Sequence, residues 1–182
     1  MDKSFENNPK KSLKCSLYDG AFFALMDGLT ASFLTPFAVA LNASVSLIAA
    51  LTYVPQLVGA FAQLFATKLS DVIKSRKKIV LIGTFMQSLL WLPLLLIPYI
   101  SPGQSYLLLV YVSLSALFLQ ATQPIGTAWI GDLVPQNERG KFFGLRNKIV
   151  GICSFVATLL AGGLLIYLSP LHPFLGFTII FS

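Results

Sequence analysis

Five polar side chains that could bind a solute or a coupling ion stand within long apolar stretches of the sequence: Asp27, Gln56, Gln63, Gln120 and Gln123. A carboxylate at such a position could hold a proton or a cation. An amide could hydrogen-bond a solute through its donor and acceptor atoms. Because polar groups that face lipid are costly, all five are expected to face other helices or a central aqueous cavity. They are therefore candidates for contact with a substrate or a coupling ion.

Asp27 has a structural interpretation as well as a functional one. In a central aqueous cavity, its carboxylate could be a site for a proton or a cation. It could instead contact a polar group on a neighbouring helix, or be wetted from the mouth of the bundle. Asp19 stands at the entrance of the same apolar stretch, where a negative charge suits the dipole of a helix N-terminus. For Asp19 the structural interpretation is preferred.

The elements that must position these side chains follow from the distribution of basic residues. The 13 Lys and Arg residues fall in three clusters, at 3–14, 68–78 and 139–148. Each interval between clusters is long enough for two membrane crossings, because a helix needs roughly 20 residues to span a bilayer. Basic residues on alternate loops are typical of cytoplasmic loops. The sequence therefore predicts an all-α, multi-pass protein of the cell membrane with a cytoplasmic N-terminus.

The apolar stretches also set the expected boundaries of the elements. Residues 1–16 are predicted to form a cytoplasmic tail, and residues 17–182 a transmembrane helical bundle. The expected helices are 17–41, 45–69, 79–99, 105–133 and 141–168, followed by an incomplete sixth at 171–182. The last stretch is too short to span a membrane. The chain is therefore expected to be the N-terminal part of a longer protein, cut within its sixth helix.

The fifth of these helices carries small residues at four-residue intervals. Ser154, Thr158 and Gly162 form this repeat, with Ala157 and Ala161 beside them. Membrane helices pack closely where small residues let their backbones approach. The repeat therefore predicts a tight contact between this helix and a neighbour.

Composition excludes several other classes of protein. Hydrophobic residues make up 55% of the chain and charged residues 11%, and the mean hydropathy is +0.77, so a water-soluble surface cannot be built. The net charge of +6 is attributed to loops beside anionic lipid headgroups, so the lipid bilayer is an expected partner and nucleic acid is not. Cys15, Cys153 and the single His172 show no ligand spacing, so no metal, cofactor or disulfide is expected.

Two loops between the expected helices carry an ordered pattern of charges, and the second of them also carries glycines. Residues 69–78 place Asp71 at the end of one helix and the basic run 76–78 at the start of the next. Residues 131–146 place an Asp-Leu-Val-Pro run before the pair Arg139–Gly140. These loops resemble those of the Major Facilitator Superfamily of secondary transporters, and most of all those of uncharacterised prokaryotic members.

The resemblance implies a fold and a set of roles. The chain would be the N-terminal six-helix half of such a transporter, and two halves would rock about a central site to give alternating access. The family's fourth helix lines the cavity and its third lies at the periphery, which favours Gln120 and Gln123 over Gln87 as substrate contacts. The charged loop residues would form a cytoplasmic gate network: Asp71, Arg76, Lys77, Asp132, Arg139 and Arg146. Arg146 could pair with Asp132 or reach the mouth of the cavity.

The predicted function is therefore that of a secondary transporter of a small solute, inactive as a fragment without its C-terminal half or a second copy. The coupling ion would be a proton or another cation. A half-size assembly subunit or a homodimeric half-transporter is the alternative. No enzyme is expected, because the acids Asp19 and Asp132 stand at the membrane edge and His172 stands alone. Sugar, amino acid, drug and lipid substrates all stay open.

Overall fold

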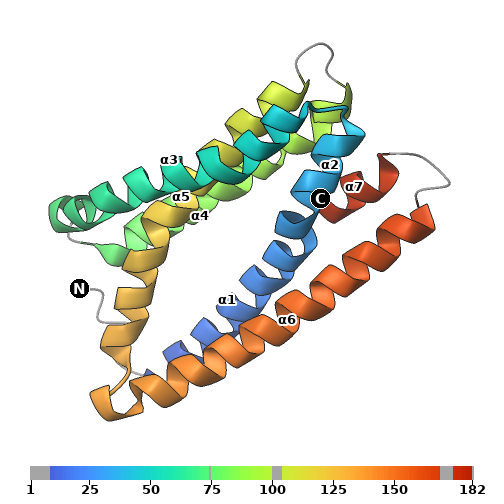
Figure 1. Ribbon diagram of the computed structural model, residues 1–182. Helices are drawn as coiled ribbons and strands as arrows, with labels where there is room; N and C mark the ends of the chain where they lie inside the picture. The colour runs from blue at the N-terminus through green and yellow to red at the C-terminus, as the bar shows by residue number, and fades with distance from the viewer. Residues whose placement is uncertain (1–8, 74, 100–103, 169–173, 182) are drawn as a thin grey trace.

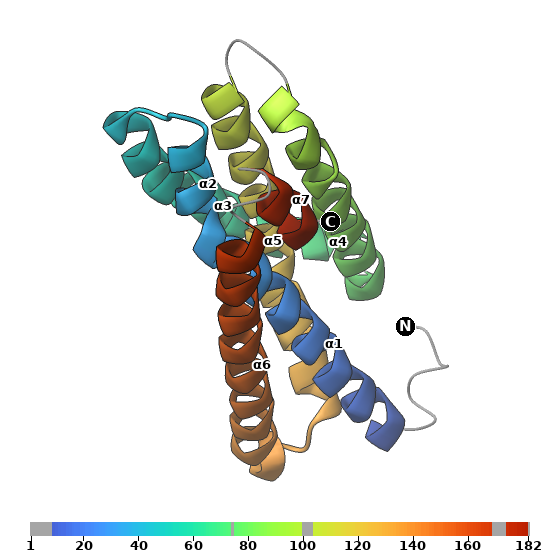
Figure 2. The same ribbon diagram turned by 90° about the vertical axis from the view of Figure 1, so that its right-hand side faces the viewer.

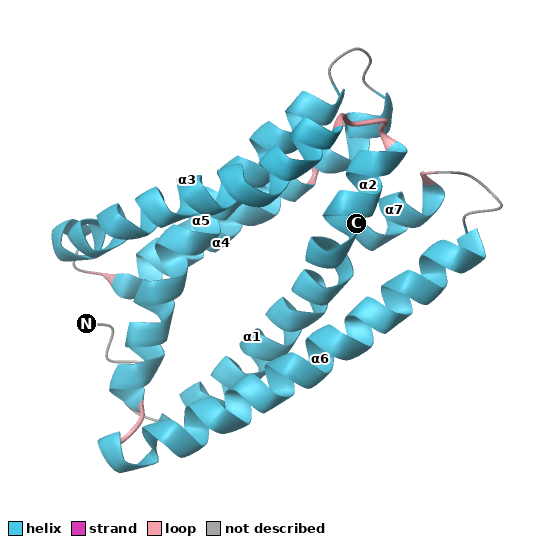
Figure 3. Cartoon of the chain, in the orientation of Figure 1, coloured by secondary structure: helices cyan, strands magenta, loops and turns pink. Residues whose placement is uncertain are grey.

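The computed structural model describes residues 9–73, 75–99, 104–168 and 174–181, which form helices and no strands (Figure 3). The α-helices are α1 (Pro9–Thr30), α2 (Leu34–Ala40), α3 (Val45–Ile73), α4 (Arg76–Trp91), α5 (Gln104–Leu133), α6 (Arg139–Leu168) and α7 (Leu175–Phe181). Short 3-10 helices lie at Ala31–Phe33, Pro93–Tyr99 and Gln136–Glu138.

Four helical segments of the described chain are long and apolar enough to cross a membrane. They are Ser12–Ala40, Val45–Ala66, Gln104–Leu133 and Gln136–Leu168. Helix α4 is shorter and continues into the 3-10 helix Pro93–Tyr99, so the expected count of six membrane helices is not established. The protein is an all-helical, multi-pass membrane protein in the part of the chain that the structure describes.

The first membrane segment differs from the expectation at both ends. Helix α1 begins at Pro9, so part of the predicted tail 1–16 is helical. Proline suits the first turn of a helix, and the polar residues after it extend the helix beyond its apolar stretch. Near the other end the chain tightens at Ala31–Phe33, and Pro36 then stands in the first turn of α2, where its missing N–H is tolerated. In the expected sixth helix, residues 171–173 and 182 lie outside the described residues.

The helices form two groups (Figures 1 and 2). In one group α5 lies between α3 and α4 and packs against both. In the other group α1 packs along α6. The two groups converge at the end of the molecule that holds α2 and α7, where a hydrophobic cluster joins them.

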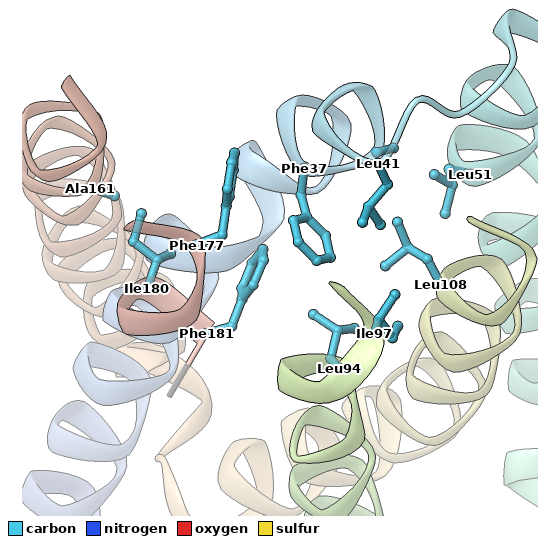
Figure 4. Packing of buried hydrophobic residues seen from close by; sticks show 11 residues of the cluster. Phe37, Leu41, Leu51, Leu94, Ile97, Leu108, Ala161, Phe177, Ile180 and Phe181 are labelled. Atoms are coloured by element: carbon cyan, nitrogen blue, oxygen red, sulfur yellow. The ribbon is translucent and has the colours of Figure 1, made fainter. Parts of the chain in front are cut away.

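This cluster consists mainly of large apolar side chains and draws on six elements: α2, α3, the 3-10 helix Pro93–Tyr99, α5, α6 and α7 (Figure 4). Its most deeply buried large members are Phe37, Leu94, Ile97 and Leu108. The ring of Phe37 lies 5.2 Å from the rings of both Phe177 and Phe181, measured between centroids. Such tilted and edge-to-face pairs are favoured aromatic contacts. The cluster therefore fixes α2 and α7 against the ends of the longer helices.

The start of α1, the turn between α3 and α4 and the turn between α5 and α6 all lie at the opposite end (Figure 1). These segments carry Lys14, Arg76 and Arg139, and we refer to this end as the basic end. Helices α1 and α6 both begin at the basic end and run side by side in the same direction. The common location of the basic residues agrees with one membrane surface facing all three segments.

Candidate functional site

The amide side chains of Gln56 on α3 and Gln120 on α5 meet in the membrane-spanning part of the molecule. The Nε2 atom of Gln120 donates a hydrogen bond to the Oε1 atom of Gln56 at 3.4 Å. Gly59 makes room for this contact, because a Cβ atom there would lie 2.5 Å from the Cγ atom of Gln120. Gln56 is exposed and Gln120 is half-buried. The pair leaves one amide nitrogen and one amide oxygen with hydrogen-bonding capacity for another molecule.

Further uncharged polar groups extend this pair along both helices. On α3, Thr52, Gln56 and Gln63 follow a spacing of four and seven residues, which places them on one face of the helix. On α5, Gln123 lies one turn beyond Gln120 and is exposed. Gln63 and Gln123 form no hydrogen bond with another described residue. We refer to Gln56, Gln63, Gln120 and Gln123 as the amide site.

The amide site lacks charge. Neither residues 45–67 nor residues 104–131 contain an acidic or basic side chain. Any hydrogen-bonding partner that reaches these faces of α3 and α5 therefore meets amides and hydroxyls. This arrangement suits groups that both donate and accept hydrogen bonds.

Asp27 lies on α1, in the other group of helices. Its side chain is half-buried, and it forms no hydrogen bond or ion pair with another described residue. The structure therefore brings Gln56 and Gln120 together but shows no contact between either amide and Asp27. Both interpretations of Asp27, as a proton or cation site and as a residue that contacts a neighbouring helix or is wetted from the mouth of the bundle, stay predictions.

At the basic end, Arg76 and Asp132 form an ion pair between the start of α4 and the end of α5. Both side chains are exposed, by 43% and 64%. The Nε atom of Arg139 donates to the backbone oxygen of Val134 at 3.2 Å and so braces the turn between α5 and α6. Lys77 follows Arg76 in the first turn of α4. The structure thus joins two of the expected gate residues directly.

Two other expected gate residues are placed differently. Asp71 lies near the end of α3, and its side chain is outside the described part of the structure. Arg146 does not pair with Asp132, because Asp132 contacts Arg76 and the guanidinium of Arg146 lies against Gly20 on α1. A Cβ atom on Gly20 would lie 3.2 Å from the Nε atom of Arg146.

The small-residue repeat of α6 makes the tight helix contact that the sequence predicts. Gly28 on α1 lies against Ser154 and Ala157. The hydroxyl of Thr158 donates to the backbone oxygen of Gly28 at 3.0 Å, which ties α6 to α1.

The sequence interpretation did miss Ser113. The Oγ atom of Ser113 is buried without a partner among the described residues. Ser113 precedes Gln120 by seven residues on α5, and Thr127 follows Gln120 by seven residues. That heptad spacing was the signal that could have placed Ser113 on the face of the amide site.

The family model described as Major Facilitator Superfamily matches residues 20–182. Neither the curated proteins nor the solved structures yield a match to this chain. The matched range includes the whole amide site and the Arg76–Asp132 ion pair.

Proposed function

Because the chain belongs to the Major Facilitator Superfamily, whose members are membrane transporters, we propose that it forms one helical half of a secondary transporter. That half would have six helices, and it would move a small solute by alternating access. The described helices supply five crossings of this plan when α1 with α2, and α4 with its 3-10 extension, each count as one crossing, whereas α7 has only seven residues and is too short to span a membrane. The remaining half is a second helical unit, supplied by further sequence or by a second copy.

The observation that carries the proposal is the amide pair Gln56–Gln120. Amides at membrane depth are costly in contact with lipid, and these two are paired with each other yet still accessible at the surface of the unit. A water-filled site between two helical halves would satisfy the unused donor and acceptor atoms. In this proposal the amide site contacts the solute, and Asp27 binds the coupling ion, a proton or another cation.

The basic end provides the proposed gate. The Arg76–Asp132 pair joins α4 to α5, and Arg139 braces the adjoining turn. Asp71 near the end of α3 and Lys77 in the first turn of α4 complete this proposed network. Exposed ion pairs are weak, which suits a contact that must form and break during transport. With the basic end and the N-terminus in the cytoplasm, this gate would close the inner side of the cell membrane.

The proposal can be tested by cysteine accessibility in membrane vesicles of both orientations. Gln120→Cys is made after Cys15 and Cys153 are replaced by serine, and the full chain is treated with a charged, membrane-impermeant maleimide. We expect Gln120→Cys to react because the site is hydrated, and a transported solute should protect it. A panel of sugars, amino acids and drugs would then identify the substrate class.

A matched control is Phe155→Cys, because Phe155 is an exposed apolar residue on α6 that should face lipid. It should stay unreactive. The proposal fails if Gln120→Cys is as unreactive as Phe155→Cys while Cys15, exposed near the start of α1, is labelled in its own single-cysteine variant.

A further inference from the structure

Two buried polar atoms near the basic end have no hydrogen-bond partner among the described residues. They are the Oγ atom of Ser16 on α1 and the Nε atom of Arg146 on α6. Ser16 as a whole is only 9% exposed. Buried donors normally have an acceptor, so an acceptor group placed between the two helices would satisfy both atoms.

Both groups lie on the same stretch of the helix contact. Atoms Nε, Cζ and Nη2 of Arg146 would lie 3.2–3.3 Å from a Cβ atom on Gly20, so the guanidinium rests directly on α1. Ser16 precedes Gly20 by one turn on the same face of α1, about 5–6 Å away. Gly20 lies against Arg146 and Gly28 lies against Ser154, so Ser16 is level with the turn of α6 that precedes Arg146. Helical side chains lean toward the N-terminus of their helix, which for Arg146 is the direction of Ser16.

The positive charge of Arg146 has no opposite charge among the described residues. Asp132 pairs with Arg76, and neither Asp19 nor Asp27 forms an ion pair with Arg146. A hydroxyl and a guanidinium both donate hydrogen bonds, so their common ligand must be an acceptor. A negative group with several oxygens fits best, and arginine is the residue that most often binds phosphate in this way.

The position of Arg146 at the basic end indicates a source of such a negatively charged group. The basic end lies at a membrane surface, and basic pockets between membrane helices at such surfaces bind phospholipid headgroups. Lys14 is exposed two positions before Ser16 and adds positive charge to the same region. Small residues on α1 leave space for the guanidinium, because Gly20 has no side chain.

We propose that Ser16 and Arg146 bind a phosphate group between α1 and α6 at the basic end. This site is separate from the amide site on α3 and α5 and does not depend on transport. The phosphate belongs either to an anionic phospholipid or to a free phosphate from solution, and the chemistry of recognition is the same for both.

The test measures both sources with the purified full chain. Delipidated protein is titrated with phosphatidylglycerol in phosphatidylcholine nanodiscs, followed by native mass spectrometry, and separately with inorganic phosphate, followed by calorimetry. We expect Arg146→Gln to weaken the binding of one of these probes by about tenfold or more. Binding of phosphatidylglycerol alone identifies a lipid site, and binding of inorganic phosphate that competes with the lipid identifies a site for free phosphate.

Lys148→Gln provides the matched control, because Lys148 is an exposed cation two positions further along α6. It should change affinity less than twofold. Ser16→Ala should weaken binding, and Gly20→Ala should do so by displacing the guanidinium. Arg146→Lys keeps the charge but loses the guanidinium, and it replaces Arg146→Gln in the binding measurement if Arg146→Gln does not fold. The proposal is overturned if neither probe binds, or if Lys148→Gln loses as much affinity as Arg146→Gln or Arg146→Lys.

Discussion

The α1/α6 pair and the α3/α5 pair are both held by close approach at a glycine, but the opposing atoms differ. At Gly28 on α1, the opposing atoms belong to the backbone of Ser154 and the Cβ atom of Ala157. At Gly59 on α3, the nearest opposing atoms belong to the flexible side chain of Gln120. A backbone contact can relax only by moving a whole helix, whereas a side chain can rotate.

The two pairs also differ in charge. Helices α1 and α6 carry the charged residues Asp27 and Arg146 within or near the membrane. The polar side chains on the facing parts of α3 and α5 are uncharged amides and hydroxyls. The comparison suggests a rigid, charged pair beside an adjustable, uncharged pair. In the proposed transporter, the adjustable pair contacts the solute and the rigid pair supports it.

Among the substitutions that test this comparison, replacing Gly28 by alanine should lower the free energy of unfolding most. The added Cβ atom would lie 2.9 Å from that of Ala157 and too close to the backbone oxygen of Ser154. Overpacking of this kind destabilises a protein by about 1–3 kcal/mol, and a backbone contact belongs at the upper end. Unfolding of the full chain in mixed micelles, titrated with SDS and followed by circular dichroism, measures the change.

The matched control is Gly151→Ala on α6, where an added Cβ atom meets nothing within 4 Å. This change should be neutral or slightly stabilising, because alanine is the better helix former. Equal unfolding midpoints for Gly28→Ala and Gly151→Ala would contradict the close approach of α1 and α6.

Replacing Gly59 by alanine should have a smaller effect, of about 1 kcal/mol. The side chain of Gln120 can rotate away from the new Cβ atom, but its hydrogen bond to Gln56 is then lost. The same SDS titration measures this change. A double-mutant cycle isolates the contact: a Gln120→Ala background removes the Cγ atom and leaves only the Cβ contact at 3.1 Å, so Gly59→Ala should cost less there than in the unmodified protein. Additive effects of the two substitutions would show that Gln120 does not lie over Gly59.

Sequence reasoning predicted the long helices better than the site. Uninterrupted apolar stretches place α3 and α5, because length and hydropathy alone decide membrane insertion. The start of α1 at Pro9 was missed, since polar residues can continue a helix beyond the bilayer and leave no apolar signal. The expected count of six crossings is not established, because the third apolar stretch combines a short α-helix with a 3-10 helix.

The candidate site was predicted only as a set of separate residues. Gln56 and Gln120 were both selected because amides are unusual in apolar stretches. Their hydrogen bond joins positions 64 residues apart, and no periodicity within one helix can pair them. The contact of Arg146 with Gly20 was missed for a similar reason, because the space for a guanidinium depends on how α1 and α6 pack.

The smallest expected effect concerns the Arg76–Asp132 ion pair. This ion pair joins α4 to α5 and lies in neither of the two helix pairs compared above. Arg76→Gln, Asp132→Asn and the double variant form a cycle, with SDS unfolding as the readout. Because both side chains are exposed, the coupling energy should lie below about 1 kcal/mol and decrease with added salt. A coupling above that range at high salt would mean that the pair fixes the fold. A weak, screened coupling is what a gate requires, because a contact that breaks in each transport cycle must not dominate the stability of either state.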